Sequence, residues 1–235
     1  MMETTAHRPV VNVTTAAYFV VAIVEIMAEL FSIEQLKFIF KPLMPALLMM
    51  LYFLTSKERN MLFYLAMLFS VITNILFIPN DPKMLFYGVI AFLIHRIIVL
   101  WLVNRLIRIN DFIPVAIATT PFLLVFFYLL AITDGIPVDT FILLSLQNIM
   151  ISLLGGIALS NYVMNDNRKN SWLLICGVLF VALQFIVFLE KYYLTGISPA
   201  IFRPIAMGLN AFAFYTFYEF VIATERSDDN GAPMG

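Results

Sequence analysis

The chain has 235 residues, of which 62% are hydrophobic and only 12% are charged, and its formal net charge is −1. A soluble domain of this size cannot bury so much apolar surface, so the composition indicates that lipid surrounds most side chains. The near-zero net charge leaves no basic surface for nucleic acid. A single cysteine, Cys176, excludes an intramolecular disulfide, and no metal-ligand spacing is present, so we expect neither a metal nor another cofactor.

Apolar windows separated by short polar stretches divide the chain into eight candidate membrane spans. A span needs about 20 apolar residues, at a rise of about 1.5 Å each, to cross about 30 Å of hydrocarbon. Short loops that join whole helices keep the backbone satisfied in lipid, so the sequence predicts an all-α, polytopic integral membrane bundle. The windows cover residues 15–33, 37–55, 61–79, 84–104, 112–132, 139–162, 171–190 and 199–224.

The spans form one transmembrane domain, residues 15–224, with a short polar segment on either side. Residues 1–14 are polar and lack the layout of a cleaved signal peptide, so we expect the first apolar stretch to be retained. Residues 225–235 are polar and contain Gly and Pro, so we predict a disordered tail. Pro42 is expected in the first turn of the second span, where a missing N–H is harmless.

Loop cations predict the orientation of the bundle. With eight spans, both termini share one side with the second, fourth and sixth loops, and the side richer in Lys and Arg faces the cytoplasm. We therefore expect a protein of the cell membrane, or of the inner membrane if the source is bacterial, with both termini in the cytoplasm. The termini side carries Arg8, Lys57, Arg59, Arg105, Arg108, Arg168, Lys169 and Arg226, and the opposite loops carry Lys37, Lys83 and Lys191.

Polar side chains inside the predicted spans mark the candidate site, because an ionisable group at this depth is costly unless it is paired or hydrated. Glu25 and Glu29 lie four residues apart and therefore on one face of the first span. The number of residues from the end of each span gives the depth of these side chains and predicts one cavity that opens on the non-cytoplasmic side. Asn210 is also expected near the midplane. Its lining would be Glu29, Lys41, Asn74, Gln184 and Arg203, and its floor Glu25, His95 and Arg96.

The same residues also fit a structural role. Glu29–Lys41 and Glu25–Arg96 would serve as ion pairs that hold helices in register, and isolated Asn or Gln side chains commonly join membrane helices. For the set as a whole we favour a functional cavity, because a bundle rarely needs so many buried charges for packing alone. The residues for which the structural role is favoured are Gln147, Asn148 and Glu219.

Four stretches carry a resemblance to a known family. They are Lys41–Leu43, Leu68–Asn74, Gly88–His95 and Gly177–Gln184. They resemble the Lys-Pro, Leu-Phe-Ser-x-x-Gly-Asp, Gly-x-x-Ala-Phe-x-x-x-His and Leu-Phe-x-x-Ser-Asp patterns of the YhhN-type lysoplasmalogenases, which are eight-span membrane hydrolases. The patterns occur in the same order and in the corresponding spans, over roughly residues 10–224.

The resemblance implies hydrolysis of the vinyl-ether bond of lysoplasmalogen or a related lysolipid, carried out by two aspartates. Asn74 and Gln184 stand where that family has these aspartates, and an amide supplies neither an acidic proton nor a negative charge. The reaction protonates the alkenyl carbon and stabilises an oxocarbenium-like cation, so it cannot run unchanged here. A carboxyl group would have to come from Glu25 or Glu29, assisted by His95.

Three functions stay open. The first is a hydrolase, with Glu25, Glu29 and His95 as catalytic candidates. The second is a non-catalytic relative that binds a membrane lipid, a partner membrane protein or another copy of itself. The third is a small transporter or channel, although no internal repeat favours it. In the second function, the residues suited to a phosphate headgroup are Lys41, Arg96, Arg203 and Asn210.

Overall fold

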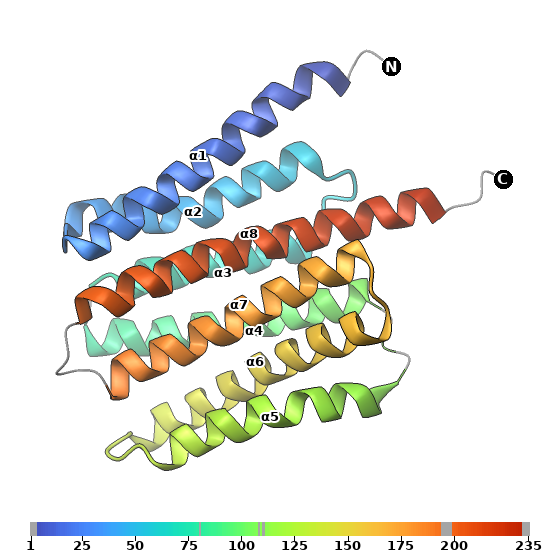
Figure 1. The fold of residues 1–235 in the computed structure, drawn as a ribbon. Coiled ribbons are helices and arrows are strands. Elements are labelled where there is room, and N and C mark those ends of the chain that lie inside the picture. Colours follow the sequence, from blue (N-terminus) through green and yellow to red (C-terminus); the bar gives the residue numbers. More distant parts are fainter. Residues whose placement is uncertain (1–3, 80, 108, 110, 194–198, 232–235) are drawn as a thin grey trace.

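The chain folds into a bundle of helices that follow the predicted spans. The computed structural model describes residues 4–79, 81–107, 109, 111–193 and 199–231, and this part contains eight helices. Consecutive helices are joined by short loops and run in opposite directions (Figure 1). The helices are α1 (Thr4–Leu30), α2 (Glu34–Thr55), α3 (Met61–Phe77), α4 (Pro82–Leu106), α5 (Phe112–Ala131), α6 (Val138–Met164), α7 (Arg168–Tyr192) and α8 (Pro199–Gly231).

The polar stretches between the windows supply helix caps. At the start of α4, the Asp81 side chain accepts hydrogen bonds from the backbone N–H groups of Lys83 and Met84. A side-chain oxygen at this position satisfies donors that have no partner within the helix. Four of the separators therefore supply the side chain that begins the next helix, whereas α2 and α6 start without a side-chain cap. The other side chains that cap a helix in this way are Asn60 of α3, Asp111 of α5 and Asn167 of α7.

The turn between α1 and α2 is short and reverses the chain sharply. The Ile33 N–H donates to the Ala28 carbonyl at 2.9 Å, and the Ser32 N–H donates to the Glu29 carbonyl at 3.3 Å. Ser32 has a φ of 54°, so α1 ends in a Schellman motif with Ser32 in the left-handed position. As a result, the first turns of α2 lie beside the last turn of α1.

Seven of the described helices form a closed ring. Around it, α1 packs on α2, α2 on α3, α3 on α4, α4 on α6, α6 on α7, α7 on α8, and α8 returns to α1. α5 packs on α6 outside this ring, at the edge of the bundle in Figure 1. The approach of α5 to α6 is close, because a Cβ added at Gly156 would collide with Thr119.

Tyrosine hydroxyls tie α8 to the first two helices. The Tyr18 hydroxyl of α1 donates to the Ala211 carbonyl of α8 at 2.7 Å. At the other end of α2, the Tyr52 hydroxyl donates to the Glu225 carboxylate. Each bond joins α8 to a helix near the start of the chain. The two bonds therefore close the ring at two positions along α8, Ala211 and Glu225.

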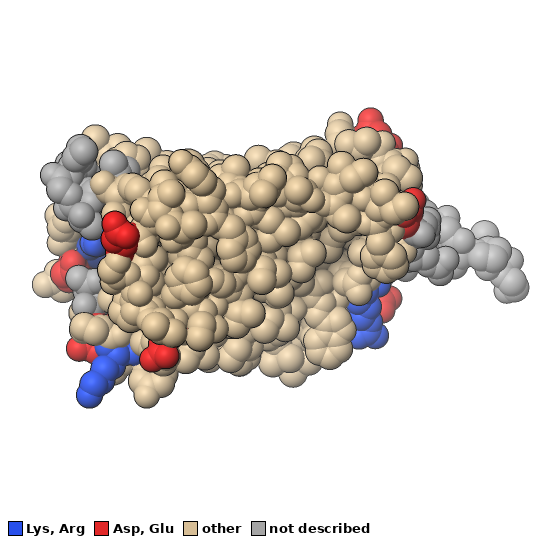
Figure 2. All heavy atoms as spheres, turned by 90° about the horizontal axis from the view of Figure 1, so that it is seen from below, with Lys and Arg blue, Asp and Glu red and all other residues tan. Residues whose placement is uncertain are grey.

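The surface of the bundle is apolar between two charged ends. Seven of the described helices are long and apolar enough to cross a membrane, and α3, with 17 residues, is slightly shorter. At about 1.5 Å per residue α3 is about 26 Å long, which is within the range of short spans. Figure 2 shows the Lys, Arg, Asp and Glu side chains of one face gathered at the two ends. The predicted polytopic helical membrane bundle is therefore confirmed.

Both terminal helices extend beyond the predicted transmembrane domain, and at the C-terminal end this corrects the expectation of a disordered tail. α1 begins at Thr4 within the segment 1–14, and α8 continues to Gly231, so residues 225–231 are helical and not a disordered tail. Residues 232–235 lie outside the described part. The Glu225 carboxylate is held by Tyr52, and helix elongation adds one backbone bond per residue without regard to the lipid boundary.

Pro42 does not lie in a first turn, because α2 begins at Glu34 and not at residue 37. Pro42 and Pro45 are both interior to α2, and neither can donate a backbone hydrogen bond to the residue four positions earlier. The carbonyl groups of Phe38 and Lys41 consequently lack their helical donors. This missing backbone bond at Lys41 becomes important at the candidate site.

Both chain ends lie at the same end of the bundle (Figure 1), and the loop cations predict that this end faces the cytoplasm. Fluorescent-protein fusions to each terminus should therefore both fluoresce, whereas alkaline phosphatase fusions at the same positions should both be inactive. The positive control is a phosphatase fusion in the α3–α4 loop, which should be active. Phosphatase activity from either terminal fusion would contradict the orientation.

Candidate functional site

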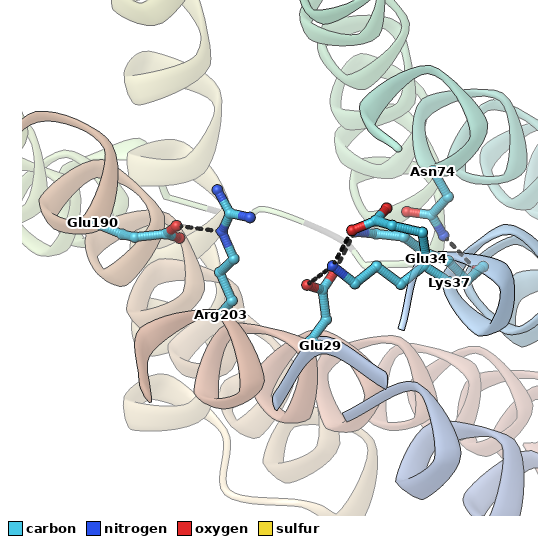
Figure 3. Close-up of polar contacts among 7 residues, drawn as sticks. Glu29, Glu34, Lys37, Asn74, Glu190 and Arg203 are labelled. Carbon is cyan, nitrogen blue, oxygen red and sulfur yellow. Dashed lines mark hydrogen bonds and ion pairs between the residues drawn. The ribbon is translucent and has the colours of Figure 1, made fainter. Parts of the chain in front are cut away.

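A carboxylate shared by two lysines lies where α1 turns into α2 (Figure 3). Glu29 Oε1 lies 3.1 Å from Lys41 Nζ, and Glu29 Oε2 lies 3.1 Å from Lys37 Nζ. Lys37 Nζ also contacts Glu34 Oε1 at 3.0 Å. The Glu29 side chain is only 6% exposed, so these are buried ion pairs. The Glu29–Lys41 pair is confirmed, and we call Glu29, Glu34, Lys37 and Lys41 the Glu29 cluster.

Lys37 was predicted to lie in a loop, and its part in the Glu29 cluster was not predicted from the sequence. The residue is buried, because α2 starts at Glu34 and includes it in the first turn. Glu34, Lys37 and Lys41 follow one another at spacings of three and four residues, which puts them on one helix face. This spacing was the signal that could have assigned Lys37 to the same group as Lys41.

Asn74 of α3 reaches the backbone of α2 directly above the Glu29 cluster. Its Nδ2 donates to the Lys41 carbonyl oxygen at 2.9 Å, which is the carbonyl that Pro45 leaves without a helical donor. Only a donor can satisfy this oxygen, and the side chain of Asn74 is buried. The amide thus fixes α3 against the start of α2.

Arg203 belongs to the same end of the bundle but makes a different pair. Its Nε lies 2.7 Å from Glu190 Oε1, and its side chain is 47% exposed. Figure 3 shows this α7–α8 pair across from the Glu29 cluster. The start of α8 thus places the Arg203 side chain at the surface, and its position in a cavity that opens on the non-cytoplasmic side stays a prediction.

Glu25 is a fully buried carboxyl group one turn before Glu29. Neither of its oxygens has a hydrogen-bond partner among the described residues. Lys41 and Glu29 lie near enough to act on it electrostatically. The alternative ion pair between Glu25 and Arg96 is wrong, because the Arg96 guanidinium binds Gln184 instead.

A second polar network joins α4, α6 and α7 in the interior. Arg96 Nη2 donates to Gln184 Oε1 at 2.8 Å, and Gln184 Nε2 donates to Asn148 Oδ1 at 3.2 Å. Arg96 Nη1 donates to the Gln147 carbonyl at 3.4 Å, and the Gln147 side chain donates to the Val89 carbonyl at 3.1 Å. We call Arg96, Gln147, Asn148 and Gln184 the Arg96 network. Gln147 and Asn148 act as helix-joining residues in it.

His95 lies beside this network and is held by a backbone group. Its Nδ1 lies 2.8 Å from the Ala66 carbonyl oxygen, and a carbonyl only accepts, so Nδ1 carries the proton. The imidazole also stacks on the Phe92 ring with centroids 5.9 Å apart. Only Nε2 is left for chemistry. Asn210 is nearly buried, and its side chain makes no hydrogen bond to any described residue.

The structure divides the predicted site residues between two networks and leaves several outside both, namely Glu25, His95, Arg203 and Asn210. Asn74 belongs with the Glu29 cluster, whereas Gln184 belongs to the Arg96 network, and both side chains are buried rather than lipid-facing. A cavity of about 10 Å³ lies against His95 and Arg96, with room for about one water molecule. A larger cavity of about 210 Å³ lies at the termini end, lined by Thr55, Lys57, Glu58, Ile222, Glu225 and Arg226. A single cavity that joins both networks stays a prediction.

The chain matches a known family over most of its length. The model of the YhhN family matches residues 36–224. The chain belongs to the YhhN family. No curated protein and no solved structure matches it. The matched range contains Lys41, Asn74, His95 and Gln184, whereas Glu25 and Glu29 lie before it on α1.

In the part of the chain that the structure describes, no group of three His, Cys, Asp or Glu side chains could hold a metal ion.

Replacing Glu29 by Gln should lower the free energy of unfolding by about 3–5 kcal/mol, because two buried lysines lose their shared carboxylate. Replacing Lys41 by Met in the same chain should cost less than the sum of the two single changes, since the pair is coupled. Denaturant unfolding in detergent micelles measures both. The matched control is Glu190→Gln in the more exposed Arg203 pair, which should cost only about 0–1 kcal/mol. Additive costs at Glu29 and Lys41 would contradict the coupling.

Replacing Asn74 by Leu should cost about 1–3 kcal/mol of unfolding free energy, because the Lys41 carbonyl would be buried without a donor. In a Pro45→Ala background the new backbone N–H can bond this carbonyl, so the same Asn74→Leu change should cost less. Unfolding free energies of the four proteins give the comparison. An equal cost in both backgrounds would show that the orphaned carbonyl is not what Asn74 serves.

Proposed function

We propose that this YhhN member binds a lysophospholipid in the membrane and has lost the vinyl-ether hydrolysis of the lysoplasmalogenases that it resembles. The observation that carries the proposal is that the side-chain amides of Asn74 and Gln184 both donate hydrogen bonds to other helices. Each stands where the resemblance places an aspartate, and each donates a hydrogen bond that an ionised carboxylate could not donate.

The contacts of Asn74 favour an amide over a carboxylate. Its Nδ2 faces the Lys41 carbonyl oxygen, so an ionised aspartate would set two acceptors against each other. Gln184 uses both ends of its amide, accepting from Arg96 and donating to Asn148. The surroundings of both residues are thus matched to amides, and their role is to join helices.

The loss of two carboxyl groups removes what the reaction needs. Protonation of the alkenyl carbon requires a general acid, which typically contributes about 10²–10⁴-fold to the rate. Stabilisation of the cation requires a preorganised negative charge, whose contribution can be as large or larger. Asn74 and Gln184 supply neither, so turnover by the family route should stay near background even when the lipid binds.

Cations at the Glu29 end support a phosphate-bearing ligand. Lys37 and Arg203 lie at the ends of their helices, close to the level expected for lipid headgroups. Each is paired with a carboxylate that is at least partly exposed, Glu34 at 58% and Glu190 at 16%. A lipid phosphate could replace these partners while the Glu29–Lys41 pair stays in place, because phosphate binds such cations in a charge-assisted manner.

Glu25 favours a second candidate function, which is hydrolysis with a different acid. Both of its oxygens lack a described hydrogen-bond partner, and its side chain is fully buried. A carboxyl group in an apolar pocket is the arrangement by which hydrolases keep a general acid protonated. In this alternative Glu25 protonates the vinyl ether, and the Glu29 cluster holds the headgroup.

An aldehyde-release assay on lysoplasmalogen separates the two candidates. We expect the purified native protein to remain near background, because its amides cannot act as acid or stabilise the cation. Turnover gained in the double variant Asn74→Asp, Gln184→Asp would support the proposal by restoring the missing groups. Robust native turnover that Glu25→Gln abolishes would overturn the proposal in favour of the second candidate.

Binding is measured separately, by native mass spectrometry with lysophosphatidylethanolamine. The double variant Lys37→Gln, Arg203→Gln should bind at least tenfold more weakly than the native protein. Lys83→Gln is the matched control, because Lys83 is an exposed cation at the same end of the bundle and should not affect binding. Absence of lysophospholipid binding to the native protein would contradict the proposed function.

A further inference from the structure

A polar cavity lies at the termini end of the bundle, between the α2–α3 loop and the C-terminal part of α8. Its volume is about 210 Å³, whereas a single water molecule requires only about 10–15 Å³. Its lining is Thr55, Lys57, Glu58, Ile222, Glu225 and Arg226. None of these described residues belongs to the Glu29 cluster or to the Arg96 network, so the cavity is a separate candidate site.

The lining residues carry two positive and two negative charges. Lys57 and Glu58 come from the α2–α3 loop, and Glu225 and Arg226 come from α8. A multiply charged anion would be attracted by the cations and repelled by the carboxylates, and a free cation would meet the reverse. A zwitterion, which has a negative and a positive group in one molecule, interacts favourably with both kinds of side chain.

Buried tyrosines hold two of the lining side chains in place. Tyr52 is fully buried, and its hydroxyl donates to the Glu225 carboxylate while it accepts from the Asn60 N–H at 3.0 Å. The Tyr218 hydroxyl donates to Thr55 Oγ1 at 2.9 Å. These bonds fix the two helix walls of the cavity before any ligand arrives, which lowers the entropic cost of binding.

The cavity lies at the level where two membrane spans end. Thr55 is the last residue of α2, and the apolar span of α8 ends at Ser227, directly after Arg226. The ends of such spans coincide with the boundary between the hydrocarbon and the lipid headgroups. Ile222 adds an apolar wall. The zwitterions that reach this level in a membrane are the headgroups of phospholipids.

The two carboxylates favour a headgroup whose cationic end donates hydrogen bonds. A primary ammonium has three N–H donors, whereas a quaternary ammonium has none. Quaternary ammonium groups are instead recognised by the faces of aromatic rings, and no aromatic ring is among the described lining residues. The cavity is therefore better suited to an ethanolamine headgroup than to a choline headgroup.

We propose that this cavity binds the headgroup of an aminophospholipid from the leaflet at the termini end, which the loop cations predict to be the cytoplasmic one. The phosphate interacts with Lys57 and Arg226, and the primary ammonium interacts with Glu58 and Glu225. This site lies at the opposite end of the bundle from the Glu29 cluster. It does not depend on lysophospholipid binding there.

The test is native mass spectrometry of the purified protein with phosphatidylethanolamine and with phosphatidylcholine of the same acyl chains. It is run in the native chain and in the Lys37→Gln, Arg203→Gln background, which removes the cations proposed for the other site. In both we expect phosphatidylethanolamine to bind about tenfold more tightly, because only its ammonium donates to the carboxylates. Equal binding of the two lipids in the double-variant background would overturn the proposal, whether or not the Glu29 end takes a lysophospholipid.

Two exposed lining residues separate the ends of the headgroup, and both variants should keep the thermal midpoint measured without lipid. Arg226→Gln should weaken both lipids by about tenfold, because both have a phosphate. Glu58→Gln should leave phosphatidylcholine unchanged and lower the preference for phosphatidylethanolamine by about threefold or more, because an amide accepts an ammonium N–H more weakly than a carboxylate does. The matched control is Arg168→Gln, an exposed cation at the same end but outside the cavity, which should change neither.

An unchanged lipid preference in Glu58→Gln, or an equal loss in Arg168→Gln and Arg226→Gln, would overturn the proposal. Free glycerophosphoethanolamine distinguishes a lipid from a soluble source of the same headgroup. It should bind more weakly than the lipid, because it lacks acyl chains beside the helices. Binding of the free compound without binding of the lipid would overturn the assignment to a membrane lipid.

Discussion

In an apolar belt, a buried charge is costly unless a partner within the protein compensates it, and the Glu29 carboxylate compensates two lysines at once. The Schellman turn at Ser32 brings the last turn of α1 against the first turns of α2, so Glu29 lies within 3.1 Å of both Lys37 and Lys41. The pairing in turn fixes the rotation of α2 about its own axis. The rest of this end of the bundle is built on that orientation.

Hydrogen bonds from side chains to backbone carbonyl groups fix the other helices to one another. The amide of Asn74 satisfies the Lys41 carbonyl that Pro45 leaves free, which joins α3 to α2. His95 binds the Ala66 carbonyl and joins α4 to α3, and Tyr18 binds the Ala211 carbonyl and joins α1 to α8. Lipid cannot replace these donors, so each contact selects one arrangement of two otherwise similar apolar surfaces.

The positions at which the resemblance places catalytic side chains make hydrogen bonds between helices in this chain. The two amides bridge helices, His95 uses one nitrogen on a backbone carbonyl, and the remaining buried carboxyl groups of the site lie on α1. α1 precedes the whole range over which the chain matches the YhhN family. Glu25 and Glu29, the carboxyl groups proposed for acid chemistry, therefore lie outside the matched range.

The sequence by itself determined the eight helices, the positions of their ends to within a few residues in most cases, the membrane-like composition and the Glu29–Lys41 pair. The helices and their ends could be predicted because hydropathy and helix caps depend on residues that are neighbours in the sequence. The Glu29–Lys41 pair could be predicted because two opposite charges at one depth on consecutive spans have few other partners. Tertiary structure alone decided that Arg96 binds Gln184 and not Glu25, that Arg203 is exposed, and that α5 lies outside the ring. The physical reason is that lipid-facing and protein-facing sides of a membrane helix are both apolar, so the pattern gives the depth of a residue but not the direction in which its side chain points.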